Sequence, residues 1–159
     1  MGGSMRPDHA AVDRTGRGRG QDAGDGAMRV SESFPGTGGA IAAARQVTGN
    51  FLRTTGARGA AVTDATVRDA MLVVSELVTN AVKHTDGPCG IELRIIGDAM
   101  AIAVWDTSPQ PPLPREPDPA RIGQHGMEIV SVLCGGFSVA QLPSGKQITA
   151  NLPLNPPAA

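Results

Sequence analysis

Three polar side chains recur at helical spacing inside one apolar run of the sequence. The segment Ala70–Thr85 reads AMLVVSELVTNAVKHT, in which Glu76, Asn80 and His84 stand four residues apart. Residues at i, i+4 and i+8 share one face of an α-helix, so these three form a polar stripe. Such a stripe beside an apolar face is typical of the wall of a functional site, although a solvated amphipathic helix gives the same pattern.

The stripe carries the oxygen chemistry that phosphate transfer needs. The amide oxygen of Asn80 is a hard ligand, suited to a Mg²⁺ ion that also holds phosphate oxygens. One turn earlier, the carboxylate of Glu76 could take a proton from an attacking hydroxyl or orient a water. The alternative for Asn80 is a mid-helix residue bonded to the backbone or to water.

Asp106 is a second candidate, at the end of the apolar run Ile102–Trp105. A carboxylate at the end of a strand can accept a hydrogen bond from an exocyclic amine such as that of adenine. An aspartate that starts a turn is equally consistent with the sequence Asp-Thr-Ser-Pro.

A third candidate, Gly123-Gln124-His125-Gly126, opens a predicted helix. Glycines allow the backbone to approach a phosphate closely, and a helix N-terminus offers free N–H groups to an anion. A plain loop-to-helix turn explains these residues as well. The pattern matches neither a P-loop nor a dinucleotide-binding fingerprint.

Two predicted helices precede the region of Asp106. The first begins at Thr37 or a neighbouring glycine and runs to about Thr55, with Gly56 as its stop. The second has Asp64 as its N-cap and ends at Asp86-Gly87-Pro88. Its apolar residues share one face and are the expected core: Val67, Ala70, Val74, Leu77, Val78 and Ala81.

The other predicted elements are strands and one short helix. A strand covers Met28–Phe34, and a hairpin turns at Gly97-Asp98. A proline-rich loop covers Asp106–Gln124, and a short helix follows it. The ranges are Cys89–Ile96 and Ala99–Trp105 for the first hairpin, Gly126–Leu133 for the helix, and Phe137–Leu142 and Lys146–Leu154 for a second hairpin. This order predicts an α+β two-layer sandwich, with a mixed, mostly antiparallel sheet and helices on one face.

Composition sets the broad class of the protein. The chain has 159 residues, a formal net charge of −1, 40% hydrophobic residues and two cysteines. The charge argues against a general binder of nucleic acid or of anionic membranes. With no apolar run long enough to span a membrane and no metal-ligand spacing around Cys89 or Cys134, we expect a cytoplasmic protein with reduced thiols.

The sequence predicts one folded domain with irregular ends. Residues 1–27 are rich in glycine, arginine and aspartate and are expected to be disordered. Met1–Ser4 is interpreted as a vector-derived remnant ahead of a native Met5. The domain is expected to cover residues 28–154, followed by a frayed tail over 155–159.

The order of the three candidates resembles the histidine-kinase-like ATPase superfamily (Bergerat ATP-binding fold). Within it, the chain is similar to the small anti-sigma-factor serine kinases of Gram-positive bacteria. The resemblance covers Phe34 to Leu154. The motifs that carry it are Ala44-Arg45, ELVTNAVKH (Glu76–His84), DTSPQPP (Asp106–Pro112), GQHGMEIV (Gly123–Val130) and SGKQITANL (Ser144–Leu152).

The resemblance implies a role for each matching residue. Asn80 corresponds to the asparagine that ligates Mg²⁺, and Glu76 to the general base for the acceptor hydroxyl. Asp106 corresponds to the acid that recognises the amino group of adenine. Gly123 and Gly126 correspond to the glycines of the ATP lid.

Neighbours of these residues complete the implied ATP-binding set, with some departures from the family pattern. His125 and Met127 lie in the lid, where His125 and Gln124 replace a common Gly-Arg. Ser108 stands where the adenine loop usually has glycine. Gln147 occupies a position where a threonine near the adenine is usual, and Thr149, two residues on, is expected on the same face.

The resemblance also implies partners and cofactors. Members use ATP and Mg²⁺, hold an RNA polymerase sigma factor inactive and phosphorylate a serine of a small antagonist protein. They are commonly homodimers and touch neither nucleic acid nor membrane directly, and Arg45 matches an arginine that faces protein partners. One alternative is a binding module of the same fold with weak or no catalysis. Another is a stand-alone phosphotransfer domain that serves a different regulator.

Overall fold

The computed structural model describes residues 28–36, 38–85, 87–108 and 124–154. The expectations for residues 1–27, for most of the proline-rich loop and for the tail 155–159 lie outside these ranges. The described elements are β1 (Arg29–Phe34), α1 (Ala40–Ala57), α2 (Asp64–His84), β2 (Cys89–Ile96), β3 (Ala99–Asp106), α3 (Gln124–Cys134), β4 (Ser138–Leu142) and β5 (Gly145–Pro153).

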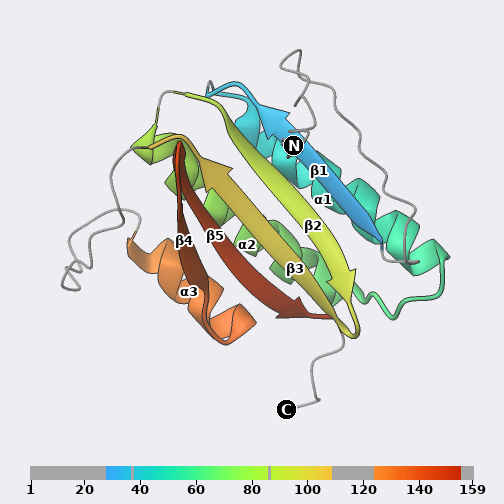
Figure 1. The fold of residues 1–159 in the computed structure, drawn as a ribbon. Coiled ribbons are helices and arrows are strands. Elements are labelled where there is room, and N and C mark those ends of the chain that lie inside the picture. Colours follow the sequence, from blue (N-terminus) through green and yellow to red (C-terminus); the bar gives the residue numbers. More distant parts are fainter. Residues whose placement is uncertain (1–27, 37, 86, 109–123, 155–159) are drawn as a thin grey trace, which may run out of the picture.

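The strands form one sheet with the order β1-β2-β3-β5-β4. All four pairings are antiparallel. Figure 1 shows α1 and α2 side by side behind this sheet. The predicted two-layer α+β fold is confirmed, and the sheet is antiparallel throughout the described strands. We call the face toward α1 and α2 the inner face and the opposite one the outer face.

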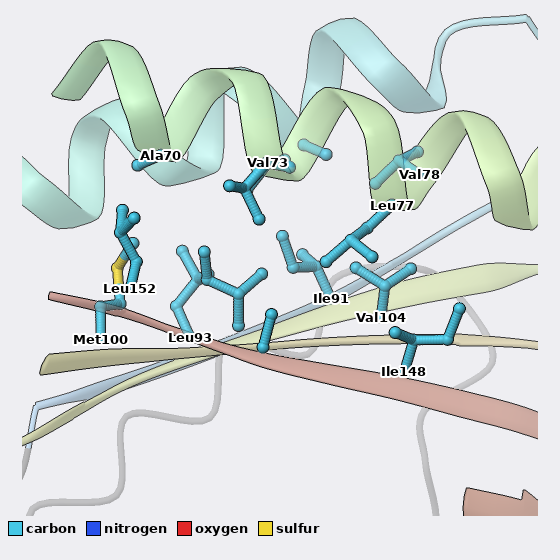
Figure 2. Packing of buried hydrophobic residues seen from close by; sticks show 14 of the residues in the cluster. Ala70, Val73, Leu77, Val78, Ile91, Leu93, Met100, Val104, Ile148 and Leu152 are labelled. Atoms are coloured by element: carbon cyan, nitrogen blue, oxygen red, sulfur yellow. The ribbon is translucent and has the colours of Figure 1, made fainter. Parts of the chain in front are cut away.

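The core lies between α2 and the inner face of the sheet. Of the apolar stripe expected on α2, Val67 is partly buried and the other five residues are buried, with no exposed surface on Leu77. Figure 2 shows side chains of α2 directed toward residues of three strands. These strand residues alternate along the chain, as a sheet with one covered face requires: Ile91 and Leu93, Met100 and Val104, Ile148 and Leu152.

Helix ends differ from the prediction by one to three residues. Thr63, not Asp64, is the N-cap of α2, and its hydroxyl accepts a hydrogen bond from the N–H of Thr66 (3.1 Å). Asp64 is the first helical residue, where its charge faces the positive end of the helix dipole. The helix α1 continues through Gly56, and the backbone reverses at Gly59, whose φ of 99° suits glycine.

Candidate functional site

The end of α2 and the end of β3 are tied together by a chain of hydrogen bonds. The hydroxyl groups of Thr85 and Thr107 are bonded to each other at 2.9 Å. Thr85 also accepts from the N–H of Gly87 (3.0 Å), and Thr107 donates to the carbonyl of Pro88 (3.2 Å). This arrangement brings the last turn of α2 to the end of the sheet at which Asp106 ends β3.

Glu76 lies against the start of α3. The helix α3 packs on α2 and on β5. A Cβ atom on Gly126, in the first turn of α3, would overlap with Oε2 of Glu76. The glycine therefore allows the carboxylate to lie directly beside the backbone, and the structure brings these two predicted site residues together.

Asn80 is half-buried one helical turn beyond Glu76, so both lie on the predicted stripe. The backbone of His84 completes α2, but its side chain lies outside what the structure describes. On the neighbouring helix, the guanidinium of Arg45 donates to the hydroxyl of Ser75 (3.4 Å). Arg45 is exposed, as expected of a residue that faces partners or solvent.

Asp106 is buried on the inner face, and both of its carboxylate oxygens have partners. Oδ1 accepts a hydrogen bond from the N–H of Ser108 (2.9 Å). Oδ2 lies 2.8 Å from Nζ of Lys146, and the side chains of Lys146 and Asp106 are only 4% and 3% exposed. Ser108 is buried as well. The predicted purine acceptor is thus one half of a buried ion pair.

The close approach of β5 to β3 positions this ion pair. Asp106 and Lys146 face each other in the antiparallel register, so their side chains share the inner face. A Cβ atom on the preceding Gly145 would overlap with the carbonyl oxygen of Asp106. Glycine at this position therefore allows the two strand ends to meet.

Sequence reasoning missed Lys146 and favoured its neighbours. In the register, Gln147 faces Trp105 and Thr149 faces Ala103, one residue out of phase with Asp106. Since successive side chains of a strand alternate between faces, Gln147 and Thr149 lie on the outer face. The structure therefore does not bring Thr149 to the predicted site. The available signal was the basic residue itself, in a strand whose alternate positions are apolar.

The lid residues fall partly outside the described chain. Gly123 is outside it, and the same holds for the side chains of Gln124 and His125, whose backbone begins α3. Gly126 is buried beside Glu76. Met127 is partly buried and packs against the hydrophobic core.

Cys89 lies at the same end of the sheet, where it is paired with Asp106 in the register of β2 and β3. Burial raises the pKa of its thiol, and the negative charge of Asp106 raises it further. The thiol is therefore neutral at physiological pH and is a poor nucleophile, because thiolate is the reactive form. Cys89 is a packing residue of the site.

The donor set suits Mg·ATP in part. The oxygens of Glu76 and Asn80 are hard ligands, which Mg²⁺ prefers when phosphate oxygens and water complete its shell. The described residues contain no group of three or more histidine, cysteine, aspartate or glutamate side chains that could hold a metal alone. Each oxygen of Asp106 can accept a second hydrogen bond, which leaves room for one from the amino group of adenine.

Glu76 and Asn80 on α2, Asp106 at the end of β3 and Gly126 at the start of α3 lie on adjoining elements of one α+β domain, in the order expected of an ATP-binding, kinase-like domain. The chain belongs to the family of the histidine kinase-like ATPase domain, whose model matches residues 34–152. The match begins at the last residue of β1 and ends at Leu152, one residue before the end of β5. A comparison with curated proteins finds no match. Among the described helices, none has the length and apolar character that a membrane span requires.

Proposed function

We propose that this protein is an ATP-binding serine kinase of the anti-sigma-factor type. It holds an RNA polymerase sigma factor inactive and phosphorylates a serine of a small antagonist protein. The unphosphorylated antagonist releases the sigma factor. The membership of the histidine kinase-like ATPase family supports the ATP site, and the resemblance of the motifs supports the partners, the homodimer and the cytoplasmic location.

The observation that carries the proposal is the arrangement of α2 and β3 at one end of the sheet. Glu76 and Asn80 follow each other along α2, and the Thr85–Thr107 hydrogen bond fixes the end of that helix beside the strand end at Asp106. A carboxylate for proton transfer, an amide for Mg²⁺ and an acceptor for a purine amine are therefore on adjoining elements.

These residues have distinct roles in the proposed reaction. Bound Mg·ATP would supply the phosphoryl group. Asn80 would hold the metal, Asp106 would orient the adenine, and Glu76 would accept the proton of the serine hydroxyl. Catalysis would depend on positioning and on neutralising charge, since phosphoryl transfer needs little covalent chemistry from the protein.

A labelling experiment tests the proposal. The full chain is incubated with γ-labelled ATP, Mg²⁺ and a small anti-sigma-factor antagonist protein, and label is expected on a serine of the antagonist. Glu76→Gln should abolish transfer while ATP still binds. The matched control is Glu92→Gln, which changes a partly exposed carboxylate on the outer face. If phosphoryl transfer continues unchanged in Glu76→Gln, the assignment of Glu76 as the general base is wrong.

One observation favours a second candidate, a binding module that sequesters its partner with little or no catalysis. Asp106, the residue expected to read adenine, is already bonded to Lys146 and to Ser108 within the chain. Calorimetric titration with ATP and Mg²⁺ separates the two candidates. A kinase must bind both ligands, whereas a binding module would hold a sigma factor in their absence.

A further inference from the structure

The buried ion pair of Asp106 and Lys146 stands where one carboxylate was expected. We propose that Lys146 is a second base-reading residue. Its ammonium group donates a hydrogen bond to N1 of the same adenine whose amino group is accepted by Asp106. This inference rests on the proposed function, because it requires that the site binds ATP.

The ion pair stays together when a ligand binds. Both side chains are almost fully buried, with Nζ and Oδ2 2.8 Å apart. Removing either partner would leave an uncompensated charge in a poorly hydrated place. A base that enters must therefore meet the ammonium and the carboxylate as one unit, after a local rearrangement exposes them.

The ion pair keeps hydrogen-bonding groups that a ligand can use. An ammonium group has three N–H donors, and the contact with Asp106 uses one of them. Each carboxylate oxygen accepts two hydrogen bonds, and Oδ1 has taken one from Ser108. The pair therefore presents a donor and an acceptor next to each other, and the donor is charged.

The donor and acceptor of the ion pair match the edge of a purine. Adenine has a donor, the 6-amino group, next to an acceptor, N1. The carboxylate and the ammonium are complementary to these two neighbouring atoms. Guanine has the reverse order at the same positions, with an acceptor at O6 and a donor at N1. A pair that reads both atoms consequently selects between the two bases.

The register leaves Lys146 as the residue of β5 that can act here. Its neighbour Gln147 is on the outer face, and the next inward residue, Ile148, is apolar and part of the core. Gly145 allows the backbone of β5 to approach the end of β3 closely. The strand ends therefore position this one polar side chain at the carboxylate.

The test compares the binding of ATP and of 1-deaza-ATP, in which N1 is replaced by C–H, by calorimetry on the full chain with Mg²⁺. A hydrogen bond to a charged group corresponds to about 10- to 100-fold in affinity, so the wild-type protein should prefer ATP by at least ~10-fold. For Lys146→Met the two affinities should be equal. The control ligand 7-deaza-ATP should bind like ATP to both proteins.

A second variant keeps the test informative if Lys146→Met folds poorly. Asp106→Asn with Lys146→Met removes both charges and keeps an acceptor for the amino group, and it too should lose the preference for ATP over 1-deaza-ATP. Equal binding of ATP and 1-deaza-ATP to the wild-type protein would overturn the inference and leave the proposed function standing. A preference for GTP over ATP would also overturn the inference. Absence of binding by every nucleotide would overturn both.

Discussion

The carboxylate of Glu76 and the backbone of Gly126 are in direct contact, although 50 residues separate them in the sequence. The contact exists because α3 packs on α2 and because the residue in its first turn lacks a side chain. A glycine predicted for phosphate contact therefore has a second role. It sets where the proposed general base can lie.

Gly126→Ala is expected to reduce activity without reducing stability. The added methyl group would displace the carboxylate of Glu76, and misplacement of a catalytic group by about 1 Å can cost about 100-fold in rate. Stability should change by less than about 1 kcal/mol, because the displaced atom ends a flexible side chain and alanine favours the helix. The measurements are label transfer to the antagonist and urea unfolding.

Gly56→Ala is the matched control for that variant. Gly56 lies near the end of α1, and a Cβ there would lie 3.9 Å from Cβ of Val62, an ordinary contact. This variant should keep full transfer activity. Normal activity of Gly126→Ala would contradict the proposed role of the contact.

Breaking the ion pair of Lys146 and Asp106 is expected to destabilise the fold. Lys146→Met leaves a buried carboxylate without its partner, which should cost about 3–5 kcal/mol in the free energy of unfolding. Replacing both with apolar residues, Asp106→Leu with Lys146→Met, should recover most of that loss. Urea unfolding of the three proteins measures both effects.

The surface ion pair of Arg29 and Glu92 provides the comparison. Its atoms are 2.7 Å apart, but the side chains are 41% and 31% exposed. Solvent screens such a pair, so Arg29→Met should change stability by less than about 1 kcal/mol. If Lys146→Met were as mild as this control, the ion pair would not matter for the fold.

The features predicted correctly from the sequence are those that depend on local residue patterns. The apolar stripe of α2 lies in the core because residues three and four apart share one helix face, and Leu77 and Val78 are fully covered. The predicted bounds of β2, Cys89–Ile96, are the observed ones, because Gly87-Pro88 precedes the strand and Gly97-Asp98 follows it.

Features that depend on register between distant strands were not predictable in this way. Whether Lys146 or Gln147 faces Asp106 is decided by the pairing of β3 with β5, about 40 residues apart, and a shift of one residue reverses the choice. The contact of Glu76 with Gly126 likewise depends on helix packing. The cap of α2 was missed by one residue, because Thr63 and Asp64 are both good capping residues.

Thr63→Ala is expected to destabilise α2. It removes the acceptor for the N–H of Thr66, and loss of a threonine cap typically costs about 1 kcal/mol. Asp64→Asn, which changes only the charge in the first turn, should cost less, about 0.3–1 kcal/mol. Thermal unfolding of both variants measures the order, and a larger effect of Asp64→Asn would contradict the assigned cap.

The thiol of Cys134 predicts a pH dependence of stability. Cys134 is half-buried at the end of α3, and burial, with a smaller contribution from the charge of Asp69, raises its pKa to about 11 from an ordinary 9.0. Between these values the unfolded chain has lost the proton that the folded chain keeps. The unfolded state then binds fewer protons, so the free energy of unfolding should fall as pH rises from 9.0 to about 11.

Comparison with Cys134→Ala isolates this effect from other groups that titrate at high pH. Urea unfolding at a series of pH values should show a steeper loss of stability for the wild-type protein than for the variant above pH 9.0. Below that pH their difference in stability should be constant. Alkylation by iodoacetamide should also be slow at neutral pH, because the reacting species is thiolate. Parallel pH curves for the two proteins would refute the raised pKa.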